Sequence, residues 1–193
     1  MLSLEESLKI LRETNALLEG HFILSSGLHS PQYIQCAQLM SKPDKASKIC
    51  VSLTEKIKDN FKEFDLILSP AMGGVLIGYE IGRLLKKETI FSERVDGKFL
   101  LRRGFTIKKN QKVLIIEDVI TTGKSSLECS KLVLESQAFV AGYACIIDRS
   151  NDNSLIKEKI ISQVRLNIPT YTKKNLPENL LSIKAIKPGS RDL

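Results

Sequence analysis

The feature that most constrains this chain is an alternation of short apolar runs with helical segments in its central part. The runs are DLILS (65–69), TIFS (89–92), KVLIIED (112–118) and VAGYACIID (140–148). Helical spacing of apolar residues predicts helices between them, at about 74–87 and 124–136. Strands that are apolar on both faces and alternate with helices are typical of a parallel sheet covered on both sides. The sequence therefore predicts an α/β fold with a doubly wound parallel sheet and flanking helices.

The first part of the chain has a different pattern. Ser3 and Glu6 form a capping box before apolar residues at helical spacing, which predicts a helix over 3–19. An extended stretch, HFILSSGLHSPQYIQC, follows, and a second helix is expected over 43–60. We expect a single domain over 1–193, with a core at about 43–150. A small hood would be built from 1–42 and the C-terminal segment.

Length and charge set wide limits on function. A chain of 193 residues can bury one substantial core. Its net charge of +7 comes from scattered residues and suits either nucleic acid or a small polyanionic substrate. No apolar run approaches the roughly 18 residues that cross a bilayer, and acids stand where a signal peptide has bases. We therefore expect a cytoplasmic protein without a membrane partner.

The cysteines form no C-x-x-C pair, and most fall at apolar positions of the expected elements. They are Cys36, Cys50, Cys129 and Cys145. Buried free thiols are the favoured interpretation, with a metal site or a nucleophile as the lesser alternatives.

A charged segment, ERVDGKFLLRRGF (93–105), separates the second and third apolar runs. Asp96-Gly97 is the two-residue turn signature of a β-hairpin. Such a segment is usually a solvated loop, but this one would emerge near the ligand-bearing end of the sheet. We expect a projecting hairpin that acts as a mobile lid and supplies cations. Those cations are Arg94, Lys98, Arg102 and Arg103.

Residues 113–126, VLIIEDVITTGKSS, carry the most specific motif. The ending GKS is that of a P-loop, but Asp118 stands where a P-loop needs glycine. Ligands of open parallel sheets bind at the carboxyl ends of the strands, where this strand turns into a helix. The turn offers free N–H groups and hydroxyls, and Gly123 permits tight bending. This combination predicts a pocket for one phosphate group.

Glu117 and Asp118 come directly before that turn. Carboxylates there would repel a triphosphate, but they suit the 2- and 3-hydroxyls of a ribose, directly or through a divalent ion. Acids followed by threonines and glycine therefore indicate a holder for ribose 5-phosphate. The alternative is a strand with solvated acids and a helix cap. That alternative would explain a lone pair of acids, but it explains the complete sequence EDVITTGKS less well.

VLIIEDVITTGKS resembles the phosphoribosyl pyrophosphate signature of the type I phosphoribosyltransferases. HFILSSGLHSPQYI (21–34) and IIDRS (146–150) are similar to the orotate phosphoribosyltransferase branch of that family. The resemblance covers most of the chain. It implies transfer of ribose 5-phosphate from phosphoribosyl pyrophosphate to orotate, giving orotidine 5-monophosphate in pyrimidine nucleotide biosynthesis. It also implies Mg²⁺ as cofactor and a homodimer.

The resemblance also implies a role for each matching residue. Phosphoribosyl pyrophosphate would be bound by Met72, Gly73, Glu117, Asp118, Val119, Ile120, Thr121, Thr122, Gly123, Lys124 and Ser125. Orotate would be bound by Ser26, Tyr33, Ile34, Thr121 and Arg149. The catalytic residues would be Arg94, Lys98 and Asp118. No residue is expected to be a metal ligand, since magnesium is bound mainly by substrate oxygens.

Arg149 also makes chemical sense without the resemblance. Its planar guanidinium is the preferred partner of a carboxylate such as that of orotate. The alternative is a surface ion pair with Asp148 or Asp152.

The chain departs from the pattern of this branch at three places. Met72-Gly73 stands where bacterial members commonly have Tyr-Lys, so backbone N–H groups at 71–74 would do more of the pyrophosphate binding. Ser25 replaces a lysine of the hood. The hairpin lacks a second lysine and a histidine, for which Arg102 and Arg103 are the candidate replacements.

Two other functions stay open at this point. One is a nucleic-acid-binding regulator that uses the ribose-phosphate site as a sensor, which the net charge supports. The other is a phosphoribosyltransferase for a purine base. The Asp148-Arg149 pair and the hood favour orotate over a purine. The absence of clustered basic and aromatic residues disfavours nucleic acid.

Overall fold

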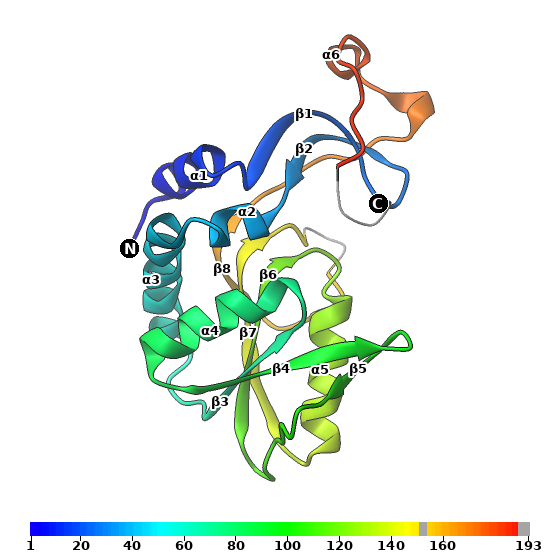
Figure 1. The fold of residues 1–193 in the computed structure, drawn as a ribbon. Coiled ribbons are helices and arrows are strands. Elements are labelled where there is room, and N and C mark those ends of the chain that lie inside the picture. The colour runs from blue at the N-terminus through cyan, green and yellow to red at the C-terminus, as the bar shows by residue number, and fades with distance from the viewer. Residues whose placement is uncertain (151–153, 189–193) are drawn as a thin grey trace.

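The structure is a computed structural model that describes residues 1–150 and 154–188. It has a six-stranded sheet with helices on both faces and a smaller hood above one edge of that sheet (Figure 1). Residues 189–193 of the expected C-terminal hood segment lie outside the described residues.

The core confirms the predicted doubly wound sheet. Its elements are α3 (Pro43–Asn60), β3 (Leu66–Pro70), α4 (Gly73–Leu85), β4 (Glu88–Val95), β5 (Lys98–Leu101), β6 (Lys112–Ile120), α5 (Lys124–Glu135), β7 (Phe139–Asp148) and β8 (Ile160–Arg165). The strand order is β5-β4-β3-β6-β7-β8. All neighbouring strands are parallel except β4 and β5, which form the hairpin.

Strand β8 was not predicted from the sequence. Its residues, IISQVR, mix apolar and polar side chains, so they lack the continuous apolar run of the inner strands. It lies at the edge of the sheet and pairs with one strand only, β7. The sheet therefore extends beyond position 150, where the expected core ended.

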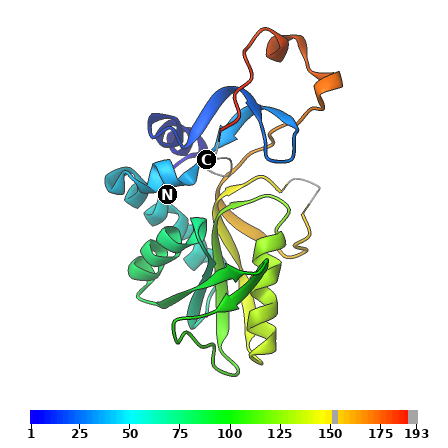
Figure 2. The same cartoon turned by 45° about the vertical axis from the view of Figure 1, so that its right-hand side comes forward.

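The helices divide between the two faces of the sheet, as the turned view shows (Figure 2). Leu114 and Ile116 of β6 belong to one buried cluster, together with residues of α3 and α4. Val113 and Ile115 belong to a second cluster with residues of α5. Successive side chains of a strand point to opposite faces, and this alternation places the two acids that follow along β6.

The strand order reverses between β3 and β6. From β3 the chain passes through α4 to β4, and from β6 it passes through α5 to β7, in the opposite direction across the sheet. Both helices therefore begin near the same point at the carboxyl edge. Open α/β sheets bind their ligands at such a switch point.

Helix α4 lies very close to the sheet because of its glycines. A Cβ atom on Gly78 would overlap the side chain of Ser69, and one on Gly82 would overlap that of Thr89. Gly74 faces the backbone of β6 at a spacing of four residues from Gly78. Glycines four residues apart therefore let this helix approach the strands closely.

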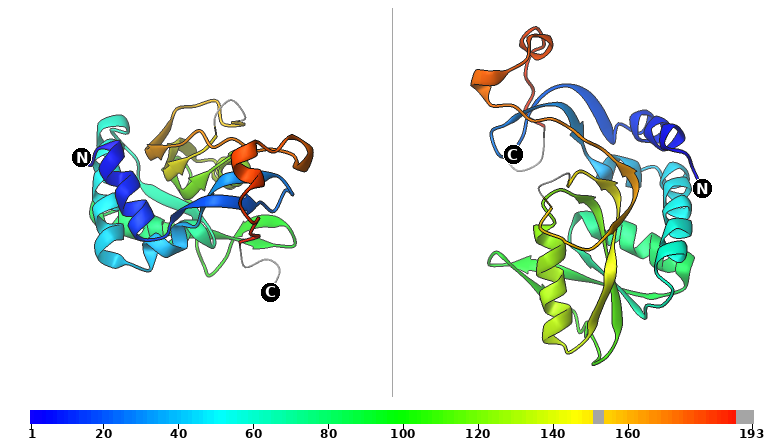
Figure 3. Two further views of the ribbon diagram at one scale, coloured as in Figure 1. Left: turned by 90° about the horizontal axis from the view of Figure 1, so that it is seen from above. Right: turned by 180° about the vertical axis from the view of Figure 1, so that it is seen from behind.

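The hood contains α1 (Leu4–Glu13), β1 (Leu17–Ile23), β2 (His29–Ile34) and α2 (Cys36–Met40). From the C-terminal part of the chain come the 3-10 helix η2 (Lys173–Asn175) and α6 (Glu178–Leu181). Strands β1 and β2 form an antiparallel pair. The C-terminal segment runs beside this pair, with bridges Phe22–Ile186 and His29–Tyr171 (Figure 3).

The predicted first helix, 3–19, is too long. It ends at Glu13, and Asn15 takes the left-handed conformation with φ 57°. Residues Leu17–Ile23 then form β1, so Gly20 lies inside a strand and does not end the helix. Pairing with β2 outweighs the helical spacing of the leucines, because cross-strand contacts override a weak local preference.

No described helix has both the length and the apolar character needed to cross a membrane.

All four cysteines are free and buried, as the sequence predicted.

Candidate active site

The motif 113–126 forms the end of β6, a turn, and the start of α5. Gly123 precedes the first helical residue, Lys124, and has a φ of 77°. A Cβ atom at Gly123 would lie 2.7 Å from side-chain atoms of Ile156. Glycine is therefore required here both for the left-handed backbone and for the space.

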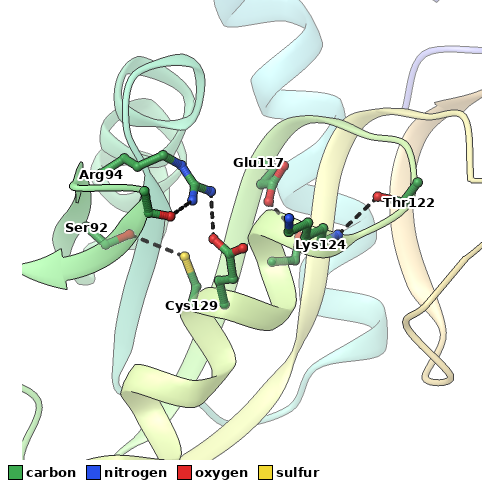
Figure 4. A network of polar contacts seen from close by, with 9 residues as sticks. Ser92, Arg94, Glu117, Thr122, Lys124 and Cys129 are labelled. Atoms are coloured by element: carbon green, nitrogen blue, oxygen red, sulfur yellow. Dashed lines mark hydrogen bonds and ion pairs between the residues drawn. The ribbon is translucent and has the colours of Figure 1, made fainter. Parts of the chain in front are cut away.

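The turn is held by a segment that the sequence did not single out. The N–H of Leu155 donates to the carbonyl of Thr122 at 2.9 Å, beside the Ile156 contact with Gly123. The N–H of Lys124 also lies 3.4 Å from the hydroxyl of Thr122 (Figure 4). Two apolar residues in an otherwise polar loop were the only available signal for this support.

The start of α5 presents unpaired donors. The first intrahelical bond runs from the N–H of Leu127 to the carbonyl of Gly123. The N–H groups of Ser125 and Ser126 therefore have no carbonyl partner within the helix. The N–H of the half-buried Ser125 and the hydroxyls of the exposed Thr121 and Thr122 are donors that one phosphate group could use, which stays a prediction.

Glu117 and Asp118 point to opposite faces of β6. Glu117 is only 7% exposed, and its Oε1 accepts a hydrogen bond from the hydroxyl of Ser126 at 2.7 Å. Asp118 lies against the loop after β3: a Cβ atom on Gly73 would be 2.5 Å from its Oδ2. The structure thus brings together the motif and the predicted pyrophosphate loop, which are far apart in the sequence.

Burial changes the proton affinity of both acids. It raises the pKa of the Glu117 carboxyl to about 7, against the hydrogen bond from Ser126 and with a further contribution from the charge of Asp118. Burial also raises the pKa of Asp118, against hydrogen bonds from backbone N–H groups. Hydroxyl groups of a bound sugar would favour the ionised forms, since a carboxylate is an acceptor only.

The loop at 71–74 joins β3 to α4. The N–H of Ala71 donates to the carbonyl of Ser92 at 2.8 Å, and the Ala71–Met72 peptide bond is cis. The Met72 side chain is 84% exposed, and α4 begins at Gly73. A second helix N-terminus therefore stands beside that of α5 at the switch point, with N–H groups available for a second anionic group.

Arg149 follows β7, directly beside the motif. Its N–H donates to the carbonyl of Ile120 at 2.8 Å. The proposed ion pair with Asp148 is absent: that carboxylate accepts from the N–H and hydroxyl of Ser150 and pairs with Arg165 at 3.5 Å. Asp152, the other candidate partner, lies outside the described residues.

The Arg149 guanidinium has no hydrogen bond or ion pair to any side chain of residues 1–150 and 154–188. Burial lowers its pKa. A half-buried cation without a partner is costly, and a carboxylate of a ligand would compensate it.

The predicted orotate residues of the hood lie on or beside the β1–β2 pair. The ring of Tyr33 stacks on Phe22 with a centroid distance of 5.8 Å, and Ser26 accepts weakly from the N–H of Leu28. Ile34 packs against the first core cluster. The hood stands over the carboxyl ends of the strands (Figure 1), but no hydrogen bond joins these three residues to the motif within the described structure.

The hairpin is confirmed, with both turn residues at positive φ, 47° for Asp96 and 79° for Gly97. In this conformation the hairpin contacts the core, and its mobility stays a prediction. Phe99 is buried in the second core cluster. The guanidinium of Arg94 lies 4.1 Å from the centroid of that ring and pairs with Glu128 of α5 at 2.6 Å (Figure 4).

The other cations of the hairpin are not gathered at the phosphate turn. Arg103 makes two hydrogen bonds to Glu93, at 2.8 and 3.1 Å. Lys98 and Arg102 are exposed. In the described parts of the chain, no group of three or more His, Cys, Asp or Glu side chains could hold a metal ion.

The raised pKa of the buried Glu117 can be tested without a substrate. Between pH 4.5 and about 7 the folded state keeps a Glu117 proton that the unfolded state has lost, so stability falls across this window. We expect Glu117→Gln to be more stable than the parent protein by roughly 1–3 kcal/mol at pH 8, and nearly equal to it at pH 4.5.

Urea unfolding of both proteins at the two pH values measures this difference. The exposed Glu135 of α5 provides the matched control, Glu135→Gln, which should change stability little at either pH. An effect of Glu117→Gln that is the same at both pH values would contradict the assignment.

Comparison with known proteins defines the class first. The family model described as the phosphoribosyl transferase domain matches residues 40–170. That range includes the sheet, the loop at 71–74, the hairpin and the whole motif.

Relatives of nearly full length define the family more narrowly. The orotate phosphoribosyltransferase of Rhizorhabdus wittichii is 47% identical over 188 residues, 97% of this chain and 96% of the relative. That of Parvibaculum lavamentivorans is 44% identical over 190 residues, 98% of each chain. The crystal structure of the Aeropyrum pernix enzyme of that name has a TM-score of 0.72 at 22% identity, covering 82% of this chain and 92% of that one, and supports the fold. The chain belongs to the orotate phosphoribosyltransferase family.

Proposed function

We propose that this protein transfers ribose 5-phosphate from phosphoribosyl pyrophosphate to N1 of orotate, giving orotidine 5-monophosphate and pyrophosphate for pyrimidine nucleotide biosynthesis. The observation that carries this proposal is Arg149, a half-buried cation without a side-chain partner among the described residues, one strand away from the phosphate turn. A base that bears a carboxylate supplies the missing partner. The names of the relatives at 44–47% identity agree with this choice.

The site can perform this transfer mainly by positioning and charge. In the proposed complex the turn at 121–125 binds the 5-phosphate, and the loop at 71–74 binds the pyrophosphate. Departure of pyrophosphate leaves positive charge on the ribose, which the carboxylates of Glu117 and Asp118 stabilise. Arg149 fixes the base so that N1 faces the anomeric carbon, and no covalent nucleophile is needed.

Magnesium is part of the proposal. The described residues offer no cluster of three carboxylate or imidazole ligands, which fits an ion carried by substrate oxygens better than a protein cage. When bound, it would neutralise charge on the pyrophosphate. We assign no residue of this chain as its ligand.

A panel of bases with phosphoribosyl pyrophosphate tests the activity. We expect turnover with orotate only, lost on chelation and restored by magnesium. Arg149→Ala should raise the KM for orotate about 10- to 100-fold, since a hydrogen bond to a charged group contributes about 1.5–3 kcal/mol. The KM for phosphoribosyl pyrophosphate should change far less.

Arg149→Lys keeps the charge but not the planar guanidinium, so its KM for orotate should lie between those of the parent protein and Arg149→Ala. The surface variant Arg12→Ala is the control. Asp118→Asn should lower turnover and leave the fold intact. Turnover with a purine and none with orotate would instead favour the purine alternative. Equal effects of Arg149→Ala on both substrates would make Arg149 structural.

We also propose that the hairpin supplies cations to the departing pyrophosphate. Arg94 would have to leave Glu128 for this, and an exposed ion pair is worth at most about 1 kcal/mol, so the exchange is accessible. Arg94→Ala and Lys98→Ala should each lower turnover, whereas Lys109→Ala, in the exposed loop beyond the hairpin, should not. Hydrogen exchange at 94–103 should slow with magnesium, pyrophosphate and a nucleotide.

If both hairpin variants keep full turnover, the backbone of residues 71–74 handles the pyrophosphate without the hairpin. Arg94→Ala should also lose up to about 1 kcal/mol of stability, because its pair with Glu128 is removed. Lys98→Ala should not.

The homodimer is a further proposal. Met72, in the loop directly before α4, and Leu76 and Tyr79 on α4 are exposed at helical spacing and form one apolar stripe. We propose that a second copy of the chain covers this stripe. Light scattering should give the mass of two chains for the parent protein and of one for Tyr79→Lys. Leu134→Lys, at an exposed position of α5, should stay dimeric.

A cytoplasmic location stays a prediction from the sequence. The nucleic-acid-binding alternative is the weaker one, because several cations are committed to acidic neighbours. Arg83 pairs with Glu80, Arg94 with Glu128, and Arg103 with Glu93.

A further inference from the structure

We propose that Ser126, the last residue of the motif 113–126, is a positioning residue for the ribose-binding carboxylate of Glu117. Its hydroxyl fixes one carboxylate oxygen so that the other faces a ribose hydroxyl of the substrate. The inference rests on the proposed function and assigns a role to a residue that follows the stretch 113–125, which resembles the family signature.

The contact is short and buried. The Ser126 hydroxyl donates to Oε1 of Glu117 at 2.7 Å, and Ser126 is fully buried. No other side chain of the described residues donates a hydrogen bond to Glu117. A glutamate has three rotatable bonds, so a single fixed donor decides which way this carboxylate faces.

Of the two carboxylate oxygens of Glu117, Oε2 is left for the substrate. A serine hydroxyl has one hydrogen, which is used on Oε1. An ionised carboxylate has no hydrogen and accepts at both oxygens, so Oε2 keeps its capacity. A sugar hydroxyl is the matching donor.

Ser126 is itself held rigidly. Its carbonyl accepts from the hydroxyl of Ser130 at 3.0 Å, and that hydroxyl lies 2.8 Å from the hydroxyl of Tyr143. These buried groups connect Glu117 on β6 with α5 and with β7. A connected and satisfied buried network restricts the positions of its members.

The same residue also adjoins the proposed phosphate turn. The backbone N–H of Ser126 lies in the first turn of α5, where donors have no helical partner. Its side chain donates a hydrogen bond to Glu117, which would bind the ribose hydroxyls of the same sugar phosphate. One helical turn thus sets the distance between the phosphate site and the hydroxyl site.

Ser126→Ala tests the proposal by the pattern of the kinetic changes. We expect the KM for phosphoribosyl pyrophosphate to rise about tenfold, the size of one lost hydrogen bond to a charged group. The KM for orotate should change less than about twofold on the same reasoning. Ser126→Thr keeps the hydroxyl and should restore most of the affinity. Ser136→Ala, at the far end of the same helix, is the matched control and should behave like the parent protein.

A double-mutant cycle tests whether Ser126 acts through Glu117. In a Glu117→Gln background, Ser126→Ala should add little to the KM for phosphoribosyl pyrophosphate. Full additivity would overturn the proposal, as would an unchanged KM for phosphoribosyl pyrophosphate or an equal rise for both substrates. Melting temperatures of each variant separate a loss of folding from a loss of positioning.

Calorimetry with simple ligands distinguishes a failure of this inference from a failure of the proposed function. Ser126→Ala should weaken binding of ribose 5-phosphate but not of inorganic phosphate, because only the former presents hydroxyls to Glu117. This result would support the inference even if the parent protein turned over no base. Equal weakening of both ligands would overturn it.

Discussion

The parallel pairing of β6 with β3 on one side and β7 on the other is the interaction on which the rest of this molecule depends. It places three loops along one edge: the turn after β6, the loop after β3 and the residues after β7. The phosphate turn, the pyrophosphate loop and Arg149 become neighbours for this reason alone. The register of β3, β6 and β7 therefore sets the spacing of these loops.

The alternation of side chains along β6 gives its two acids different surroundings. Glu117 turns toward α5 and meets a serine, while Asp118 turns toward α4 and meets a glycine backbone. Both are neighbours of buried apolar residues, which raises the pKa of each. The free protein therefore holds these carboxylates at a cost in stability, as is common where a site is arranged for its ligand.

The sequence predicted the parts of the molecule whose signal is local. The apolar strands and the Asp96-Gly97 turn are such signals, and the structure confirms them. The prediction from sequence missed features that exist only through contacts between distant segments. Pairing with β2 made a strand of Leu17–Ile23, and Phe99 joins the hairpin to the second core cluster. The support of Gly123 by Ile156 and the link from Ser126 to Glu117 were missed for the same reason.

The contact between Gly73 and Asp118 means that two positions of the site share one volume. A Cβ atom at position 73 would stand 2.5 Å from the Asp118 carboxylate, although 44 residues of chain lie between the two. Any side chain at position 73 would therefore push the Asp118 carboxylate aside. In this protein a change in the loop after β3 is also a change at the end of β6.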